Sequence, residues 1–140
     1  MAKIVCVILG CCLLFNGVAG IFAPGFMQMH LSVVHIIILL ASGVFALFFG
    51  FTGTKFASKV FCFLFGGLFS VLGILGFVFG SPGAPTGPGP TDAYLWRFIP
   101  GGLELGFMDH IVHIIFGVAF LIGAFAQRDT EEVENPYPQM

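Results

Sequence analysis

The amino-acid sequence predicts an all-α integral membrane protein, a four-transmembrane-helix bundle made of two tandem helical hairpins. Three observations lead to this prediction. Of the 140 residues, 58% are hydrophobic and only 9% are charged, whereas about a quarter of the residues in soluble domains are charged. The mean hydropathy is +1.05. The apolar residues also fall into four long runs separated by shorter polar segments.

Each apolar run is long enough to cross a bilayer, which takes roughly 20 helical residues. Because hydrocarbon offers the backbone no hydrogen-bonding partner, each run is expected to be an α-helix. The four spans belong to a transmembrane domain, residues 1–128, whose outward loop is 80–105; an acidic tail, 129–140, follows it. The predicted spans are about 4–22, 31–51, 56–79 and 106–126.

The basic residues predict the orientation of the helices. Membrane proteins carry more lysine and arginine in their cytoplasmic segments. Only Arg97 lies in the segments on the other side. We therefore expect both termini in the cytoplasm, and a multi-pass protein of the bacterial inner membrane. The basic residues on the cytoplasmic side are Lys3, Lys55, Lys59 and Arg128.

The two halves of the sequence carry the same ordered pattern. In each half a glycine pair ends one helix, Gly-Phe-Met follows in the loop, and a histidine opens the next helix. The matching histidines are His35 and His113. The copies run in the same direction, so their pseudo-twofold axis is expected along the membrane normal. We therefore expect the two imidazoles at the same depth, converging on one site or flanking the bundle axis.

Small residues predict where the helices approach one another. Glycine and serine spaced four residues apart share one helix face and let two backbones come close. Gly76 and Gly80 form one such pair, and six glycines are the candidates for helix packing. They are Gly17, Gly20, Gly73, Gly76, Gly80 and Gly117.

The outward loop begins with a segment rich in proline and glycine, residues 81–90. Proline donates no backbone hydrogen bond, so we expect an extended spacer here that is neither helix nor strand. Tyr94, Trp96 and Phe98 follow, around Arg97. Aromatic residues of this kind are typical of the membrane–water interface.

All four histidines cluster at the outward side, together with an acidic residue. Ionisable groups in membrane spans are costly and need a reason to be there. Asp109, His110 and His113 share one helix face by their spacing, whereas His30 is expected in a loop and His35 at the start of the second span. A carboxylate one turn before an imidazole can fix its tautomer, as it does for metal ligands.

Three interpretations of these side chains stay open. They hold the two hairpins together through hydrogen bonds, or they bind a cofactor, or they line a path for protons or ions. As cofactor ligands, His35 and His113 are the best placed for haem, chlorophyll or a metal. A transition-metal site of Asp109, His110 and His113 belongs to the same interpretation.

The sequence resembles a bacterial family of four-helix membrane proteins of unknown function. That family has Gly-x-x-Gly ending the first helix, a histidine opening the second and Asp-x-x-x-His opening the fourth. The resemblance covers most of residues 4–126, with Leu39 in place of a small residue and Gly43 one turn further on. It implies a four-helix fold and a membrane location, but no activity. The matching residues are Gly17, Gly20, His35, Asp109 and His113, followed by Gly117. A weaker resemblance is to DoxX-like four-helix membrane proteins.

We expect no enzymatic activity, because the sequence pairs no nucleophile with a base and has no phosphate-cradling loop. The net charge of −2 also gives no reason to expect nucleic acid as a partner. The small lipid-embedded body and acidic tail favour an accessory subunit of a larger bacterial membrane complex, respiratory or photosynthetic, with lipids and other subunits as partners. The alternatives are a cofactor-binding module that uses His35 and His113, and a small transporter or proton-conducting protein.

Overall fold

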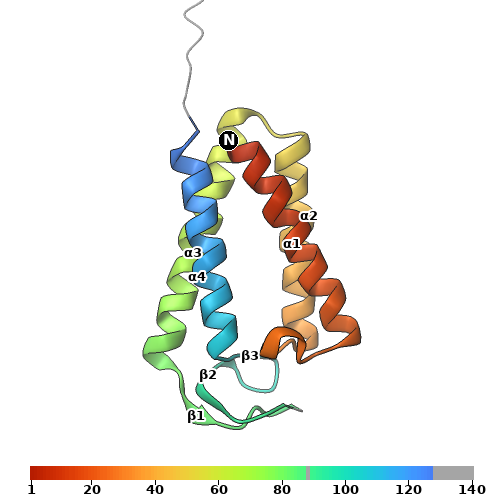
Figure 1. Cartoon of the computed structure of the whole chain (residues 1–140), viewed down its shortest axis with the longest axis vertical. Coiled ribbons are helices and arrows are strands. Elements are labelled where there is room, and N and C mark those ends of the chain that lie inside the picture. The colour runs from red at the N-terminus through yellow and green to blue at the C-terminus, as the bar shows by residue number, and fades with distance from the viewer. Residues whose placement is uncertain (88, 128–140) are drawn as a thin grey trace, which may run out of the picture.

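The computed structural model describes residues 1–87 and 89–127, and these are mostly helical (Figure 1). Arg128 and the predicted acidic tail lie outside the described residues. The elements in chain order are α1 (Ala2–Phe22), the short 3-10 helix η1 (Phe26–Gln28), α2 (Val33–Phe51), α3 (Lys55–Phe79), β1 (Ser81–Gly83), β2 (Asp92–Ile99), β3 (Leu103–Leu105) and α4 (Phe107–Phe125).

Four helices, α1 to α4, are long and apolar enough to cross a membrane. Each begins and ends within two residues of its predicted span. Their outer surface is apolar as well, which suits contact with hydrocarbon rather than with water. Large side chains that are more than half exposed occur on all four helices and include Phe15, Ile37, Phe48, Phe63, Ile74 and Ile115.

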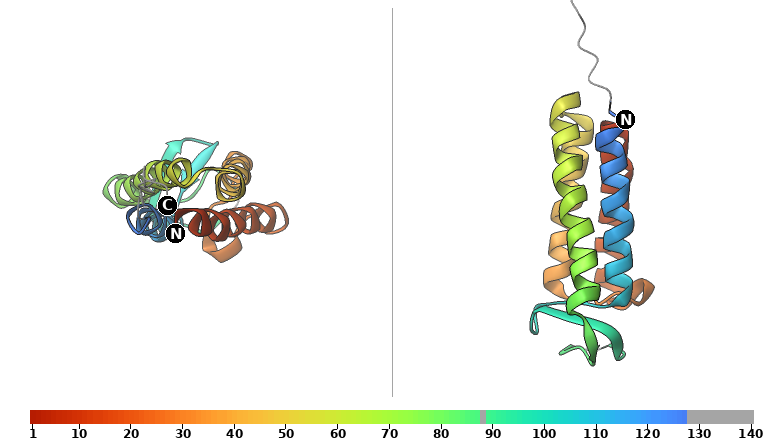
Figure 2. Two further views of the ribbon diagram at one scale, coloured as in Figure 1. Left: turned by 90° about the horizontal axis from the view of Figure 1, so that it is seen from above. Right: turned by 90° about the vertical axis from the view of Figure 1, so that its left-hand side faces the viewer.

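The four helices form two antiparallel hairpins, α1 with α2 and α3 with α4. Between the hairpins, α1 packs against α3 and α4, while α2 makes fewer contacts with α3. Viewed along the bundle, α2 lies diagonally opposite α4 (Figure 2). The bundle axis therefore lies between α2 and α4.

Glycines allow the paired helices to approach closely. A Cβ atom added to Gly66 of α3 would lie 2.8 Å from the backbone nitrogen of Leu121 and 2.9 Å from the carbonyl oxygen of Gly117, both in α4. In the other hairpin, a Cβ on Gly43 of α2 would lie 3.0 Å from the carbonyl oxygen of Gly10 in α1. Each hairpin is therefore held by direct contact between backbones.

The six glycines predicted to pack between helices all lie against neighbouring segments. Gly80 differs from the rest, because it ends α3 and lies against the backbone of Tyr94 in β2. The others face the other helix of their own hairpin or the segment that leads into it: Gly17, Gly20, Gly73, Gly76 and Gly117.

The outward loop contains a small sheet, so the fold is mostly helical rather than purely α-helical. The first three residues of the predicted spacer, 81–83, form strand β1, whereas the described residues from 84 to 90 are in neither helix nor strand. Strands β1, β2 and β3 pair antiparallel in that order. Pro82 is tolerated because β1 is a short edge strand. The sheet forms because β2 buries Leu95 and β3 buries Leu105, each 2% exposed or less, and these contacts outweigh the local preference of proline and glycine for irregular structure.

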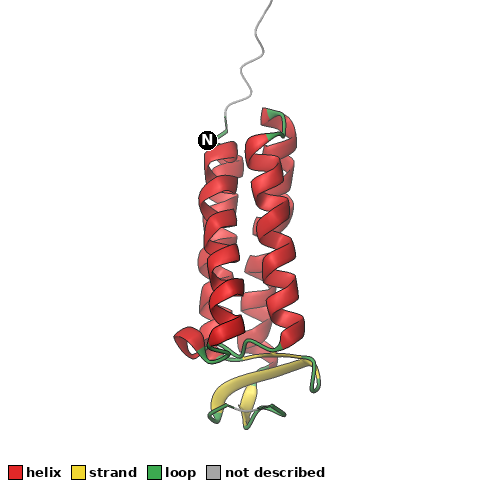
Figure 3. Ribbon diagram, turned by 90° about the vertical axis from the view of Figure 1, so that its right-hand side faces the viewer, coloured by secondary structure: helices red, strands yellow, loops and turns green. Residues whose placement is uncertain are grey.

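The sheet lies across one end of the bundle, which we call the sheet end (Figure 3). The N-terminus and the turn between α2 and α3 lie at the opposite end. The predicted aromatic belt is part of β2: Tyr94 packs edge-on against Phe77, with ring centroids 5.4 Å apart, and Trp96 stacks on Phe79 at 6.0 Å. Aromatic contacts therefore join the sheet to α3.

The close approach of α3 and α4 predicts opposite effects for two adjacent glycines. Gly66→Ala is expected to destabilise the protein by about 1–3 kcal/mol, because the new methyl group meets backbone atoms of α4. Nothing lies within 4 Å of a Cβ added to Gly67, so Gly67→Ala is the matched control and is expected to gain about 0.5–1 kcal/mol. Reversible unfolding in mixed detergent micelles, followed by circular dichroism, measures both. Equal stabilities would contradict this packing.

Candidate functional site

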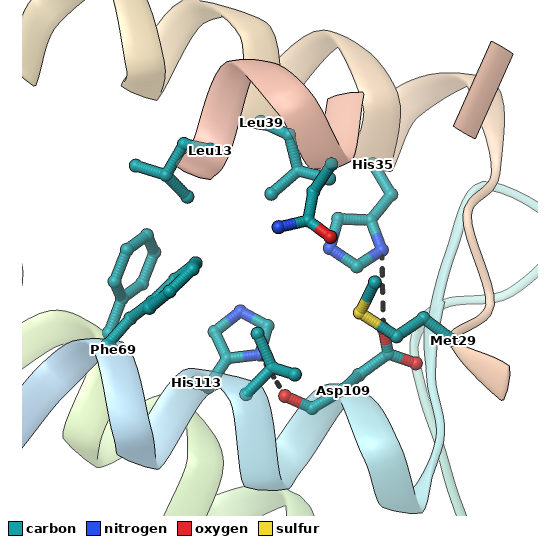
Figure 4. A pocket seen from close by; sticks show the side chains of 10 residues that line it. Leu13, Met29, His35, Leu39, Phe69, Asp109 and His113 are labelled. Carbon is teal, nitrogen blue, oxygen red and sulfur yellow. Dashed lines mark hydrogen bonds and ion pairs between the residues drawn. The ribbon is translucent and has the colours of Figure 1, made fainter. Parts of the chain in front are cut away.

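His35 and His113 come together near the sheet end of the bundle, one from α2 and one from α4. Their ring centroids are 6.1 Å apart, with an angle of 19° between the ring planes. His35 is 4% exposed. Figure 4 shows the two rings pointing toward one another across a shared space. The sequence left two arrangements open, convergence on one site or a position on either side of the bundle axis; in the structure the two rings line one cavity although their helices are diagonal to each other.

The hydrogen bonds of the two rings determine which nitrogen faces the shared space. His113 Nδ1 lies 2.6 Å from the carbonyl oxygen of Asp109, and His35 Nδ1 lies 3.2 Å from the carbonyl oxygen of His30. A carbonyl oxygen only accepts, so each Nδ1 donates, which is the arrangement that leaves the lone pair on Nε2 in a neutral ring. Each Nε2 therefore keeps a lone pair, and neither has a partner among the described residues.

A small cavity separates the two rings. Its volume is about 20 Å³, which is room for about one water molecule or a single ion. Apolar side chains form most of its wall, and the polar groups come from both hairpins. The lining residues are Leu13, Asn16, Met29, His35, Leu39, Phe69, Asp109, Val112, His113 and Phe116.

Asn16 is a site residue that the sequence interpretation missed. Its Nδ2 donates to the carbonyl oxygen of Cys12, 2.9 Å away, while its buried Oδ1 has no partner within the described part of the chain. A signal was present, because Asn16 is the single side-chain amide in the four apolar runs. Polar groups inside membrane spans usually serve a contact or a site.

Asp109 ties the two hairpins together at the edge of this cavity. Its Oδ2 accepts from the backbone N–H of Gly106, at 2.8 Å, and from that of His30, at 3.0 Å. The first bond caps the start of α4, and the second holds the segment that leads into α2. The other oxygen, Oδ1, has no hydrogen-bond partner within the described residues and lies 3.8 Å from His35 Nδ1. The carboxylate thus faces the imidazole of the other hairpin, whereas we had expected it to orient His113.

His110 lies apart from the cavity, so the structure does not assemble the predicted metal site of Asp109, His110 and His113. His110 Nε2 donates to the carbonyl oxygen of Tyr94 at 2.8 Å, and the ring packs on Phe77 and Gly76 of α3. His110 and His113 are three residues apart on α4, and their side chains point in different directions. His110 faces α3, whereas His113 faces the bundle axis. Among the described residues there is no group of three or more His, Cys, Asp or Glu side chains that is suited to a metal.

All polar atoms that border the cavity without a partner are electron-pair donors. Asn16 Oδ1 and Asp109 Oδ1 are buried without a hydrogen-bond partner among the described residues. The imidazoles of His35 and His113 and the sulfur of Met29 line the same cavity (Figure 4). No N–H or O–H group of the described residues donates a hydrogen bond to the two Oδ1 atoms. Buried acceptors without donors are costly, so the cavity suits a cation or a molecule that donates hydrogen bonds.

A larger cavity of about 320 Å³ adjoins the small one. It shares His35, Leu39, Phe69 and His113 with it, and its other lining residues come from α2, α3 and the sheet. This side of the bundle is where α2 and α3 make few contacts. The larger cavity therefore offers a route by which a small species reaches the imidazoles.

Two acidic residues hold the sheet over the site. Asp92 accepts from the backbone N–H groups of Phe107, at 3.0 Å, and Tyr94, at 2.8 Å, and its Oδ2 lies 3.5 Å from His30 Nε2. Burial by itself raises the pKa of Asp92, but these backbone N–H groups and His30 outweigh it and hold the pKa below its ordinary value.

Glu104 of β3 joins the sheet to the loop before β2. It accepts from the backbone N–H of Thr86 at 2.7 Å and from its hydroxyl at 2.5 Å, and it lies 3.8 Å from the guanidinium of Arg97. Burial opposes the charged form, but the hydrogen bonds from Thr86 and Gly101 and the charge of Arg97 prevail, so the pKa of Glu104 is lowered.

Comparisons with protein-family models, curated proteins and solved structures found no match to this chain. The resemblance to a family of four-helix membrane proteins therefore stays a prediction.

The lowered pKa values predict how the sheet responds to acid. A depressed carboxyl pKa contributes stability that is present above the ordinary pKa, 4.5 for Glu104, and is lost as the pH falls through the lower pKa of the folded state. We expect the emission of Trp96, the single tryptophan, to change below about pH 4.5 in detergent. Glu104→Gln is expected to weaken this transition and to lower the melting temperature at pH 7.

The part of the acid transition that remains in Glu104→Gln belongs to Asp92, and the double variant with Asp92→Asn is expected to remove it. An unchanged acid transition in the double variant would show that other groups control the sheet.

Proposed function

We propose that this chain is a multi-pass integral membrane protein that binds one transition-metal ion between its two helical hairpins, with His35 and His113 as the principal ligands. The observation that supports this most directly is the pair of imidazoles with free Nε2 lone pairs on opposite sides of one small cavity. Neutral imidazole is the commonest metal ligand in proteins.

The spacing of the rings suits a shared ion. Nitrogen ligands bind such ions at about 2.0–2.1 Å, which brings the centres of two rings on one ion to roughly 5–6 Å. The observed centroids are 6.1 Å apart. Both Nδ1 atoms donate to backbone carbonyls, which is how metal-binding histidines are usually oriented.

The cavity volume favours a single ion over haem or chlorophyll. About 20 Å³ separates the rings, whereas pockets for drug-sized molecules measure roughly 300–1,000 Å³. A tetrapyrrole between these imidazoles would require the hairpins to separate. The buried, unpartnered Oδ1 atoms of Asn16 and Asp109 add negative potential to the same space, and a cation relieves the cost of leaving them unpaired.

The packing toward the opposite end favours binding over conduction. Beyond the cavity, Phe61 and Phe120 occupy the bundle interior and are each 5% exposed or less. An ion or proton path needs polar groups or water along its length, and these side chains offer none. We therefore propose that the site holds a bound ion and is not part of a path that conducts ions across the membrane.

The other functional predictions remain predictions. They comprise a bacterial inner membrane with cytoplasmic termini, the absence of catalysis, and a role as accessory subunit of a larger complex. The acidic tail that suggested a protein partner lies outside the described residues. An accessory subunit with a bound metal is compatible with the present proposal.

Metal binding to the purified protein tests the proposal. Isothermal titration in detergent with Zn²⁺, Co²⁺ and, under anaerobic reducing conditions, Cu⁺ is expected to show one ion per chain for at least one of these metals. His35→Ala and His113→Ala are each expected to weaken that binding by about tenfold or more, because each removes a ligand.

The matched control is His30→Gln, which removes an imidazole near the site that does not line the small cavity. It is expected to change the affinity less than about twofold. The proposal fails if none of the three metals binds, or if the His30 and His113 variants lose affinity equally. The histidines would then serve to hold the hairpins together.

A further inference from the structure

We infer that the ion is monovalent copper and that the sulfur of Met29 is its third ligand. This inference rests on the proposed metal site and names the metal. Three independent observations support it: the identity of the soft ligand, the charge around the cavity, and the backbone conformation that directs Met29 inward.

Met29 supplies the only sulfur among the side chains that line the small cavity of the described chain. Thioether and imidazole ligands together suit Cu⁺, because soft sulfur ligands select it, whereas Mg²⁺, Ca²⁺ and Mn²⁺ prefer oxygen. Zinc sites use cysteine, histidine and carboxylate. Asp109 is the third such residue at the cavity, but its Oδ2 already accepts from two backbone N–H groups, and no three such side chains of the described residues are arranged to hold a metal. A ligand set of two imidazoles and one thioether therefore favours Cu⁺ over these other metal ions.

The charge around the site matches a monovalent ion. Asp109 is 1% exposed and lies 3.8 Å from His35 Nδ1. The two imidazoles and Met29 are neutral as ligands, so this carboxylate is the one anionic group of the small cavity. One Cu⁺ ion balances it. A divalent ion would leave one uncompensated positive charge in a buried site, which is costly.

The backbone before Met29 turns its side chain into the bundle. Met27 and Gln28 both have positive φ angles, 53° and 60°. This left-handed conformation is strained for residues other than glycine. After this turn the backbone N–H of Met29 donates to the carbonyl oxygen of Phe26 at 3.1 Å, and Met29 is 4% exposed although it lies in a loop. Met27, two residues earlier, is 50% exposed.

Asp109 completes the arrangement as a positioning residue. Its Oδ2 holds the backbone N–H of His30, and the carbonyl oxygen of His30 accepts from His35 Nδ1. A carboxylate behind a ligating histidine orients the ring and makes it a better electron donor. The same carboxylate caps α4, so the ligand geometry and the relative position of the hairpins depend on one side chain.

The test compares Cu⁺ and Co²⁺ binding in the full chain in detergent. Cu⁺ affinity is measured anaerobically by competition with a chromophoric Cu⁺ chelator, and Co²⁺ affinity by its visible absorption. Met29→Leu keeps the side-chain size but removes the sulfur. It is expected to weaken Cu⁺ binding by about tenfold or more and to change Co²⁺ binding less than about twofold. Met27→Leu is the matched control and is expected to change neither.

X-ray absorption of the Cu⁺-loaded protein gives an independent result. We expect nitrogen scatterers together with one sulfur scatterer, and loss of the sulfur signal in Met29→Leu.

The outcomes separate the two proposals. If Co²⁺ or Zn²⁺ binds through His35 and His113 but Cu⁺ is not preferred, or if Met29→Leu leaves Cu⁺ affinity and the sulfur signal unchanged, the copper inference is wrong and the metal site stands. If no metal binds in a manner that depends on the two histidines, the proposed function is wrong as well.

Discussion

The carboxylate of Asp109 is the interaction on which the sheet end of this protein depends. One of its oxygens accepts two backbone hydrogen bonds, from Gly106 at the start of α4 and from His30 before α2. These two segments belong to different hairpins, so a single buried group sets how the hairpins meet. With α4 and the His30 segment held together, His35 and His113 face each other across the bundle axis. A buried charge is retained only where it is well paired, and here the pairing also defines the site.

The polar groups of the cavity have a strong effect because they lie in an apolar environment. Between apolar helices, electrostatic interactions are stronger than in water, both for satisfied and for unsatisfied groups. His35, His113, Asn16 and Asp109 all line the same small volume, and the Oδ1 atoms of Asn16 and Asp109 have no hydrogen-bond partner among the described residues. Such a cavity favours a positive charge over a neutral apolar occupant. Toward the opposite end the bundle interior is filled by aromatic and aliphatic residues, so the preference for a positive charge is limited to the sheet end.

The sequence predicted the helices well because hydropathy reports a local property. A run of about 20 apolar residues has few alternatives to a helix, whichever neighbours it packs against. The sheet was not predictable in the same way. Residues 81–90 are poor in strand formers, and β1 exists because β2 pairs with it and Leu95 is buried beneath. Strand pairing depends on residues distant in sequence, which a local pattern does not contain.

The same distinction between local and long-range information applies to the candidate site. By itself the sequence determined that the histidines and Asp109 lie at one end of the bundle, because helix rise and span length fix the depth of each residue. Only the tertiary structure decided that α2 and α4 are diagonal, that His110 turns toward α3, and that Asn16 and Met29 join the cavity. The physical reason is that depth follows from position along one helix, whereas contact across the bundle follows from how helices and loops pack. Glycine contacts and a left-handed turn before Met29 set that packing.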